Sequence, residues 1–550
     1  MASDRRLHVG CGGRKLHGFI NLDIAGEPDL KCDVREGLPF PDGSISRIFS
    51  EHFIEHLTRP QAIRFLLECY RALEPGGVCR IATPDLDDLV SGYTSNDWRE
   101  REWISKFGFE WVPNKCVMLN IGLRSFGHRH NFNYDDLAMA GALAGFLLAR
   151  RCKPGESTLA DLRSIEYRQD SVVIEFVKEC DALRDQLPLV SILVPAYNHR
   201  FLKQALHSGL AQTYPNCEII VCNDNPAGQI DAVMAEFTDH PRIRYCRNPQ
   251  NMGAVANYIE CLRKANGTLI KFLNDDDLLH ADCVRRMVCY MQAYGERISL
   301  VTSKRQRIDA AGLPLRDDYS TTAIVPQDSY VNRNDLADLM LSRFVNLVGE
   351  PTTVMFRKAD LANLLPAPIS FHGRSYGFNV DLAMSLTLLT KGDVIYIVQP
   401  LSCFRIHPKQ DQKNPRVRFG LIRAWSDFVN DSRAAGFLST PDAYGQALVC
   451  LVKLFRSSAN DPSLTQPQAE ELVFLAAKAE AELAGIPADP AAKQSRRFRH
   501  CIKRIHRSEG WRPPLRYCFT HAGVPPREKG PAAWIKLCIR RLLRTRRRTE

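Results

Sequence analysis

The sequence has no paired cysteines, no long apolar run and no apolar segment at its start. Its 18 cysteines are scattered without a CxxC pair, which argues against a zinc ribbon or a disulfide framework and favours reduced thiols. No run reaches the roughly 18–20 apolar residues that a membrane-spanning helix requires. No apolar region follows the opening MASDRR, so we expect no secretory signal and a cytoplasmic protein.

Basic charge is concentrated at one end of the chain. The net charge is +11, but residues 491–550 contain 18 Lys and Arg against three Asp and Glu, and residues 1–490 contain 55 basic and 59 acidic residues. The body is therefore slightly acidic, and the basic character belongs to the tail. At 550 residues, of which 45% are hydrophobic and 25% charged, the chain is long enough for about three soluble domains.

The order of sequence patterns indicates the fold class. Short apolar runs alternate with amphipathic segments over residues 6–178, a second alternation starts at residue 189, and helical patterns dominate after about residue 420. Such alternation is typical of mainly parallel sheets covered by helices. The predicted fold class is therefore α/β, with two tandem Rossmann-like domains and a helical C-terminal region. The predicted boundaries are 1–180, 188–420, a helical extension over 421–490 and a basic tail over 491–550.

The first unit opens with a strand that runs directly into a glycine-rich turn, GCGG (10–13). Glycines at this place allow a tight turn and the close approach of a ligand to the backbone. A second strand, FINLDI, ends at Asp23, about a dozen residues after the turn. A carboxylate there is suited to accept hydrogen bonds from ribose hydroxyls. An ordinary turn followed by a surface aspartate is the alternative.

With these features in place, the first unit resembles class I S-adenosylmethionine-dependent methyltransferases over about 170 residues. The matching segments are LHVGCGG (7–13), NLDI (21–24), CDVREGLPFPDGSIS (32–46), SEHFIEHL (50–57), RALEPGGVCRIATPD (71–85), GHRHNFNYDDLAMAGALAGF (127–146) and SVVIEFVK (171–178). The resemblance implies that S-adenosylmethionine is the cofactor. It further implies contacts from Gly10 and Gly12 to the methionine part, from Asp23 to the ribose, and from Asp33 and Val34 to the adenine. It places Glu51 and His52 at the floor of the site.

Three features depart from the methyltransferase pattern. His8 stands where the family usually has an acidic residue, Arg14 displaces the third glycine, and about seven residues separate Gly13 from the next strand, too few for a crossover helix. They motivate a second hypothesis, in which the first domain is a non-catalytic binding or scaffolding module. His128 and His130 are candidates for a base or a metal-binding pair, although paired histidines in loops are more often structural.

Carboxylates follow two strands of the second unit. One strand, EIIV, leads to Asp224, and the strand in KFLNDDDLLH (271–280) leads to Asp275–Asp277. Because the ligand crevice of an open α/β sheet lies at the carboxyl ends of its strands, we expect these side chains to converge there. A nucleotide diphosphate cannot meet bare carboxylates, but Mg²⁺ or Mn²⁺ bridges the two kinds of group. The alternative is a solvated acidic turn that caps a helix.

Residues 189–410 resemble family 2 glycosyltransferases with the GT-A fold. The matching segments are VSILVPAYN (190–198), LAQTYPNCEIIVCND (210–224), NMGAVANY (251–258), GTLIKFLNDDDLL (267–279), GEPTTVMFRKADL (349–361) and VDLAMSLTLLTKGDVIYIVQPLSCFRIH (380–407). The resemblance implies an inverting, metal-dependent transfer from a nucleotide sugar. It places Pro195, Tyr197 and Asn198 near the nucleotide, Asp224 on the base, Asn274 at the first place of the DxD motif, Asp275 near the ribose or phosphate, and Asp276 on the metal. It leaves Asp277 either to assist the metal or to cap the next helix.

Inversion requires a base that takes the proton of the acceptor hydroxyl. In GFNVDLAMSL (377–386), Asp381 stands where the family keeps that carboxylate, and a helix N-cap is its alternative role. Arg405 and His407 are candidates for contacts with the diphosphate and the metal, with core packing as the alternative. The predicted donor is a nucleotide sugar, UDP-sugars being favoured. The predicted acceptor is a glycan or lipid-linked molecule in surface polysaccharide synthesis, and the first domain would add methyl transfer.

The tail contains a basic amphipathic pattern, PAAWIKLCIRRLLRTRRR (531–548). Its apolar residues recur at helical spacing, with basic residues largely on the other side. Such a helix suits an anionic membrane surface, and therefore a peripheral position at the inner face of the cell membrane, or a partner protein. No nucleic-acid-binding motif accompanies it, so we expect no nucleic acid, and a solvated tail without fixed structure is the alternative.

Overall fold

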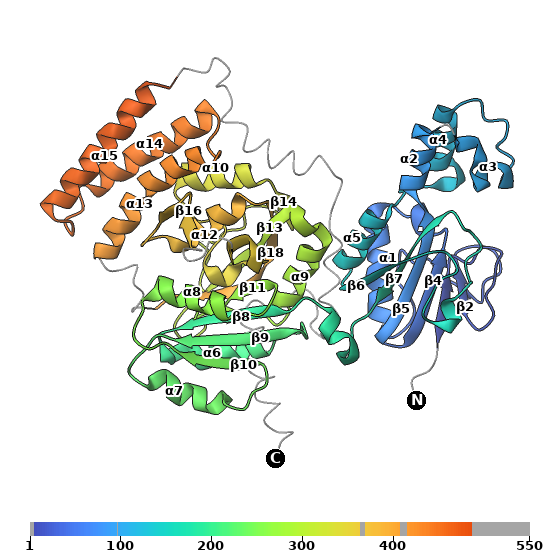
Figure 1. The fold of residues 1–550 in the computed structure, drawn as a ribbon, viewed down its shortest axis with the longest axis horizontal. Coiled ribbons are helices and arrows are strands. Elements are labelled where there is room, and N and C mark those ends of the chain that lie inside the picture. The colour runs from blue at the N-terminus through green and yellow to red at the C-terminus, as the bar shows by residue number, and fades with distance from the viewer. Residues whose placement is uncertain (1–4, 96, 319, 363–368, 408–414, 487–550) are drawn as a thin grey trace. The chain divides into compact units, whose positions relative to one another are not determined.

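The computed structural model of the chain describes residues 5–95, 97–318, 320–362, 369–407 and 415–486. The main division between its two compact units falls between Leu187 and Pro188, and each unit is described by itself (Figure 1). The basic tail, with the predicted amphipathic helix, lies outside the described residues. No helix in the described part of the chain is long and apolar enough to cross a bilayer.

A seven-stranded sheet in the order β3-β2-β1-β4-β5-β7-β6 forms the centre of the first unit. Its strands are β1 (Arg6–Val9), β2 (Ile20–Asp23), β3 (Leu30–Lys31), β4 (Ile45–Glu51), β5 (Leu73–Pro84), β6 (Leu148–Cys152) and β7 (Ser171–Val177). The neighbours from β3 to β5 are parallel, whereas β7 is antiparallel to both β5 and β6. Because the strand order reverses between β1 and β4, the ligand crevice is expected at the carboxyl ends of these two strands.

The connection from β1 to β2 is short. Its described residues, 10–19, form no helix, as its length in the sequence predicted. The chain turns back at once, because the backbone amides of Gly10 and Cys11 both donate to the carbonyl oxygen of Leu22, at 2.9 and 3.1 Å. The glycine-rich turn is therefore held at the carboxyl end of β1 by the neighbouring strand.

Two groups of helices accompany the sheet of the first unit (Figure 1). The helices α1 (Arg59–Ala72) and α5 (Tyr134–Leu143) pack against each other. The helices α2 (Leu86–Thr94), α3 (Glu102–Lys106) and α4 (Lys115–Arg124) follow β5 and have their own apolar cluster around Trp98 and Met118. We call α2–α4 the helical cap.

A nine-stranded sheet forms the centre of the second unit, in the order β10-β9-β8-β11-β15-β13-β18-β12, with β14 paired to β18. Its strands are β8 (Val190–Ala196), β9 (Cys217–Asn223), β10 (Ile243–Arg247), β11 (Leu269–Phe272), β12 (Leu278–Leu279), β13 (Ile298–Ile308), β14 (Ser329–Val331), β15 (Met355–Arg357) and β18 (Asp393–Arg405). The strands β10, β9, β8 and β11 are parallel. The other half is mixed, because β15 is antiparallel to both β11 and β13.

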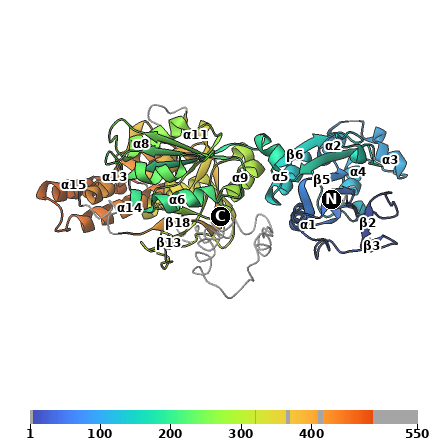
Figure 2. The ribbon, with the colours of Figure 1, turned by 90° about the horizontal axis from the view of Figure 1, so that it is seen from below.

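Helices cover both faces of this sheet. They are α6 (His199–Leu210), α7 (Gln229–Met234), α8 (Ala254–Lys264), α9 (Cys283–Tyr294), α10 (Arg333–Arg343), α11 (Lys358–Ala362) and α12 (Val380–Leu389). Figure 2 shows α8 on one side of the sheet and α6 on the other. This follows from right-handed crossovers, because the strand after α6 and the strand after α8 lie on opposite sides of β8. A small hairpin of β16 (Ser370–Phe371) and β17 (Arg374–Ser375) precedes α12.

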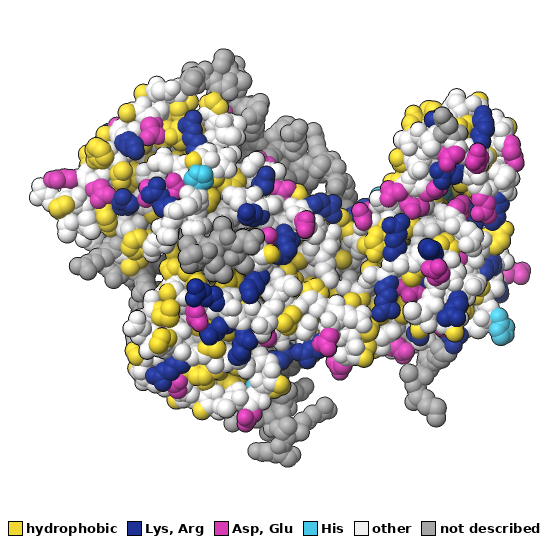
Figure 3. All heavy atoms as spheres, viewed as in Figure 1, with side chains coloured by type: hydrophobic (Ala, Val, Ile, Leu, Met, Phe, Trp, Pro, Cys, Tyr) yellow, Lys and Arg dark blue, Asp and Glu magenta, His cyan; other side chains and the backbone are white. Residues whose placement is uncertain are grey.

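Three helices close the described chain: α13 (Pro415–Ala434), α14 (Pro441–Ser458) and α15 (Gln466–Ala484). Phe428, Leu448 and Leu472 of these helices belong to the same apolar cluster as Leu193 and Ile220 of the sheet, so the helical region shares the core of the second unit. On the face that Figure 3 shows, acidic and basic side chains are interspersed over both units. The predicted fold class, two tandem α/β units followed by helices, is confirmed.

Candidate functional sites

The acidic segment of the second unit, Asn274–Asp277, begins two residues after β11 and leads into β12. Beneath it lies Lys271, which is fully buried and donates through Nζ to the carbonyl oxygens of Thr352 and Val354. Burial lowers the pKa of this ammonium group. Lys271 therefore attaches the end of β11 to the segment that precedes β15.

Asp275 is bound by the turn between β8 and α6. Its Oδ2 accepts hydrogen bonds from the backbone amides of Tyr197 and Asn198, at 2.7 and 2.6 Å. Burial raises the pKa of Asp275 to about 7, although these two amides oppose the rise. Asn198 is the N-cap of α6, and its side chain accepts from the amide of Arg200. Asp275 thus fixes the turn in which the predicted nucleotide-binding residues lie.

The structure brings together Asp276, the first choice as metal ligand, and His407, a candidate for contact with the diphosphate or the metal. Asp276 Oδ2 lies 3.1 Å from His407 Nε2, and the side chain of Asp276 is 21% exposed. The carbonyl oxygen of Asp276 accepts from Arg405 Nε at 2.7 Å, which holds the backbone of the motif against the end of β18. A partly exposed carboxylate beside an imidazole is a donor set that fits a divalent cation.

Asp277 lies below the surface. It is 1% exposed, its Oδ1 accepts from the backbone amide of Arg405 at 3.1 Å, and its Oδ2 accepts from the hydroxyl of Thr352 at 2.7 Å. This arrangement disagrees with the prediction that Asp277 binds the metal directly. Asp277 does not cap a helix either, because β12 follows it and α9 begins only at Cys283.

The structure also disagrees with the prediction that Arg405 contacts the diphosphate. Its side chain is fully buried, stacks over Phe201 at 4.3 Å, and donates to the carbonyl oxygens of Asp276 and Asp309 and to Gln204 Oε1. A guanidinium group committed in this way does not reach a diphosphate. Core packing, the alternative in the sequence analysis, describes its position.

Asp224 follows β9 and is 3% exposed. Its carboxylate accepts from the amides of Met252 and Gly253 and from Asn248 Nδ2, at 2.8 to 2.9 Å. These bonds fix the turn that opens α8. The structure thus gives Asp224 a positioning role, and a contact with the nucleotide base remains a prediction. Pro195 lies in β8 beside the exposed Tyr197.

Asp381 lies in the first turn of α12, whose N-cap is Asn379, so the N-cap alternative for Asp381 is wrong. Its Oδ2 accepts from Asn346 Nδ2 at 2.8 Å. Burial raises the pKa of Asp381, and the Asn346 hydrogen bond partly opposes the rise. A carboxyl group with a raised pKa is suited to act as a general base near neutral pH.

Tyr258 shows that these carboxylates share one region. Its hydroxyl donates to Asn274 Oδ1 at 2.5 Å. Burial, followed by the charges of Asp277, Asp275, Asp276 and Asp381, raises the pKa of this phenol. Tyr258, Thr352 and Asn346 were not predicted as site residues. The first two lie inside the segments NMGAVANY and GEPTTVMFRKADL, which carry the family resemblance.

The glycine-rich turn of the first unit agrees in part with the resemblance to methyltransferases. Gly10 has a φ of +71°, and a Cβ there would lie 2.5 Å from the ring of Phe53. Gly12 has a φ of +51° and open space where a Cβ would be. Its amide donates to Asp23 Oδ2 at 2.8 Å, and Asp23 Oδ1 accepts from the amide of Ala25. Gly12 thus lies at an open edge beside Asp23, and a contact of either residue with a cofactor remains a prediction.

Other predicted cofactor residues are committed to the protein. Glu51 binds Arg14 at 3.0 Å and accepts from the amides of Tyr167 and Arg168. Asp33 pairs with its neighbour Arg35 at 2.6 Å, and Val34 is 5% exposed. His8, which departs from the family pattern, is buried, and its Nδ1 lies 3.1 Å from Asn21 Oδ1. The fit to S-adenosylmethionine therefore rests on Gly12 and Asp23, with Gly10 shaping the turn.

His128 and His130 do not form a pair. His130 Nε2 lies 2.7 Å from Asp136, whereas His128 faces a cavity that also contains Glu55 and His56. The two side chains therefore do not form the metal-binding pair that was one candidate for the segment GHRH, and the bond of His130 to Asp136 fits the structural role that was favoured.

Comparisons with known proteins agree with both resemblances. Residues 191–360 match the family model for glycosyl transferase family 2, and residues 19–81 match the model for a methyltransferase domain. An uncharacterized glycosyltransferase of Rickettsia bellii is 29% identical over 136 residues, which are 24% of this chain and 19% of that protein. The chain spans about a fifth of the length of the first curated relatives that it matches.

Two further matches have assigned activities or ligands. The Escherichia coli UDP-Glc:alpha-D-GlcNAc-diphosphoundecaprenol beta-1,3-glucosyltransferase WfgD is 34% identical over 104 residues, which are 19% of this chain and 41% of that protein. The crystal structure of S. aureus TarS 1–349 with UDP-GlcNAc aligns with a TM-score of 0.37 at 12% identity, over 59% of this chain and 93% of that one.

Proposed function

We propose that the second unit catalyses an inverting, metal-dependent reaction. The premise is that the chain contains a family 2 glycosyltransferase domain preceded by a methyltransferase domain, and is thus an enzyme of nucleotide-sugar glycosyl transfer. The observation that carries the proposal is the partly exposed Asp276 carboxylate, 3.1 Å from His407 Nε2, and the charges of Asp276 and Asp381 both act on the Tyr258 phenol. One partly exposed carboxylate for a cation and one carboxylate of raised pKa are the two groups that such a transfer needs.

Asp381 is the proposed base. It takes the proton from the acceptor hydroxyl while that oxygen attacks the anomeric carbon, and the bond from that carbon to the nucleotide diphosphate breaks. Asn346 orients the carboxylate through its 2.8 Å hydrogen bond. Asp275 contributes indirectly, because it holds the backbone amides of Tyr197 and Asn198 in the turn beside the proposed nucleotide site.

Asp276 and His407 are the residues that would hold the cation. When bound, a divalent cation neutralises the charge that develops on the leaving diphosphate. An imidazole ligand suits Mn²⁺ better than Mg²⁺, which prefers an all-oxygen environment. We therefore expect Mn²⁺ to support the reaction better than Mg²⁺.

A UDP-sugar is the favoured donor, and a glycan or a lipid-linked molecule in surface polysaccharide synthesis is the proposed acceptor. Support comes from the E. coli relative, whose name gives UDP-Glc as donor and a diphosphoundecaprenol-linked sugar as acceptor. The match covers 41% of that protein, so the substrates are part of the proposal.

A panel of nucleotide sugars, incubated with the full-length chain and Mn²⁺, tests the proposal. Asp381→Asn is expected to lower kcat by about 10²–10⁴-fold, the usual contribution of a general base, and to leave donor binding intact. Asp239→Asn, which changes an exposed carboxylate outside the motif segments, is the matched control. A transfer rate retained in Asp381→Asn removes this residue as the base.

The cation site has its own test. Asp276→Asn is expected to weaken Mn²⁺-dependent binding of the UDP-sugar by at least about tenfold, because the charged ligand is lost. If the variant binds the UDP-sugar with Mn²⁺ as well as the unchanged chain does, the assignment of Asp276 is wrong. Calorimetry measures this binding without any need for turnover.

For the first unit we propose binding of S-adenosylmethionine, which would supply a methyl group for the glycan product or a neighbouring group. Gly12 and Asp23 would hold it at the carboxyl end of β1. The second candidate, a non-catalytic module, is favoured by the Arg14–Glu51 ion pair and by the ring of Phe53 over Gly10.

Titration of the full-length chain with S-adenosylmethionine separates these two candidates. We expect heat of binding, a raised unfolding temperature and weaker binding in Asp23→Asn. No heat and no thermal protection would establish the non-catalytic module instead.

A further inference from the structure

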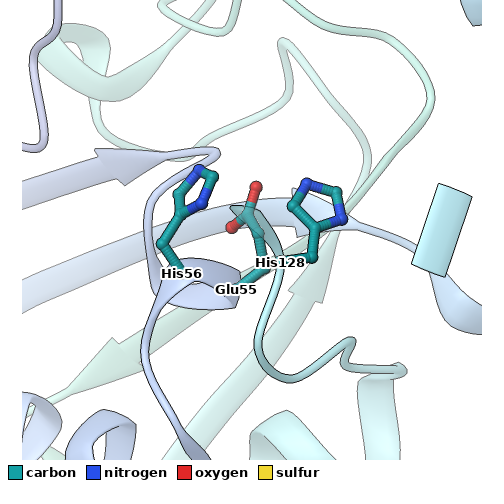
Figure 4. A group of neighbouring side chains, drawn as sticks. All are labelled: Glu55, His56 and His128. Carbon is teal, nitrogen blue, oxygen red and sulfur yellow. The ribbon is translucent and has the colours of Figure 1, made fainter. Parts of the chain in front are cut away.

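A cavity of about 200 Å³ lies within the first unit, between the sheet and the helical cap. Its wall includes Glu55 and His56 from the short 3₁₀ helix η1 (Ile54–His56) and His128, which follows the 3₁₀ turn η3 (Ser125–Gly127). Figure 4 shows the carboxylate of Glu55 between the imidazole rings of His56 and His128. The proposed roles of Gly12 and Asp23 do not involve these three side chains.

Backbone hydrogen bonds bring the two segments together across more than 70 residues of sequence. The amides of Arg129 and His130 both donate to the carbonyl oxygen of Glu55, at 2.8 and 3.1 Å. Gly127 has a φ of +81°, and a Cβ at this position would lie 3.7 Å from His56 Nδ1. The close approach of the two segments is thus built into their backbones.

Glu55 has an unusual environment for a carboxylate. It is fully buried, and its Oε2 accepts from the hydroxyl of Thr83 at 2.9 Å. Its Oε1 has no hydrogen-bond partner among the described residues, and His52 Nδ1 lies 3.4 Å away. A buried carboxylate oxygen without a donor is costly unless a cation or proton accompanies it.

The imidazole ring of His128 has the orientation of a metal ligand. Its Nδ1 lies 3.0 Å from the carbonyl oxygen of Gly122, and because a carbonyl only accepts, Nδ1 carries the proton. The lone pair is therefore on Nε2. A histidine that binds a metal through one nitrogen usually donates the other N–H to a carbonyl or carboxylate in this manner.

We propose that Glu55, His56 and His128 form a binding site for a late first-row divalent cation such as Zn²⁺. One ligand atom from each residue lies within 4.8 Å of the other two. Donor atoms around tetrahedral Zn²⁺ are about 3.4 Å apart, so the three side chains would draw together when the cation binds. Two histidines and one glutamate form an established donor set that leaves coordination positions open, and here the open side faces the cavity.

Ion pairs balance most of the charge of the cavity wall. Asp88 pairs with Arg101, Asp85 lies 4.0 Å from Arg151, and Asp170 lies 3.7 Å from Arg168 Nε. Glu55 is the carboxylate of this wall without an arginine ion pair among the described residues. A divalent cation would therefore meet a carboxylate that no arginine neutralises.

The test uses the full-length chain with Asp276→Asn, which removes the proposed cation ligand of the second unit, after treatment with a chelator. Titration with Co²⁺ is expected to give one equivalent of bound metal with visible d–d absorption, which Zn²⁺ then abolishes by displacement. His56→Gln, His128→Gln and the nearly isosteric Glu55→Gln are each expected to raise the Kd for Co²⁺ at least about 100-fold.

His130→Gln is the matched control, because this neighbouring histidine pairs with Asp136 outside the cavity wall, and its Kd should be unchanged. The 18 cysteines are the competing ligands, and binding to them would appear as a thiolate-to-cobalt charge-transfer band. That band, an absence of stoichiometric binding, or an unchanged Kd in the Glu55 and His128 variants would overturn the site. Circular dichroism confirms that each variant is folded.

Discussion

Three consecutive aspartates at the end of β11 have three different environments. Two backbone amides from the β8–α6 turn bind Asp275, whereas Thr352 and the amide of Arg405 bind the buried Asp277. Asp276 keeps a partly exposed carboxylate beside His407. The difference comes from partners in distant segments rather than from the residue type. Asp276 is therefore the member of the motif suited to meet a soluble cation.

The pKa of Asp381 leads to a prediction for the pH dependence of transfer. A base works only when deprotonated, so activity is present above its pKa and is lost as the pH falls through it. Because burial raises the pKa of Asp381 from its ordinary value of 3.8, the acid limb of kcat/KM should lie at a higher pH than for an exposed aspartate.

Asn346 provides a second variant for this pH profile. Its hydrogen bond stabilises the ionised form of Asp381 and so lowers the pKa. Asn346→Ala should move the acid limb to still higher pH, whereas Asp239→Asn should leave it in place. An acid limb that stays unchanged in Asn346→Ala would contradict the assignment of Asp381. Initial rates measured over a range of pH provide this comparison.

Gly10 gives a prediction about local packing. A Cβ at this position would lie 2.5 Å from the Phe53 ring, and its φ of +71° is unfavourable for alanine by about 1–2 kcal/mol before the collision is counted. Gly10→Ala should therefore destabilise the first unit by more than that amount. Gly12→Ala, with open space around it, is the control and should be affected by backbone strain alone. Equal losses of unfolding free energy in chemical denaturation would contradict this account.

At the scale of elements, the sheet of the first unit depends on a buried cation. Arg80 of β5 is fully buried, pairs with Glu166, and binds Glu175 of β7 at 2.7 Å. Removing one member of a buried ionic group leaves its partners uncompensated, so Arg80→Met should destabilise the unit by about 3–5 kcal/mol. Arg456→Met is the matched control: its side chain is 63% exposed and pairs with Glu480, and its loss should be within about 1 kcal/mol. Denaturant titration followed by circular dichroism measures both variants.

Elements were easier to predict from the sequence than the partners of their side chains. The short β1–β2 connection and the carboxylates after β9 and β11 follow from glycine placement and apolar runs, which are local signals. The burial of Arg405 was not predictable, because its acceptors in residues 204, 276 and 309 are far apart in the sequence. The approach of His128 to Glu55 was missed for the same reason.

At the scale of the whole molecule, the helical region belongs to the core of the second unit, whereas the basic tail follows the last described helix. Helices α13–α15 share the apolar core of the second unit, so a truncation near residue 420 would expose that core to water. The last described helix, α15, ends at Ala484. A chain that stops at residue 490 therefore keeps the shared core and loses only the basic tail.

Deletion of residues 491–550 tests the proposed membrane contact. The segment carries 18 basic and three acidic residues, and each Lys or Arg near an anionic surface contributes about 1 kcal/mol at most. The full-length chain should co-sediment with phosphatidylglycerol-containing vesicles but not with phosphatidylcholine alone, and added salt should weaken the binding because it screens charges beyond about 8 Å. The shortened chain should not bind, yet should transfer sugar to a soluble acceptor at the full-length rate. Steep salt-dependent affinity for duplex DNA, lost with the same deletion and without vesicle binding, would instead show that the tail binds nucleic acid.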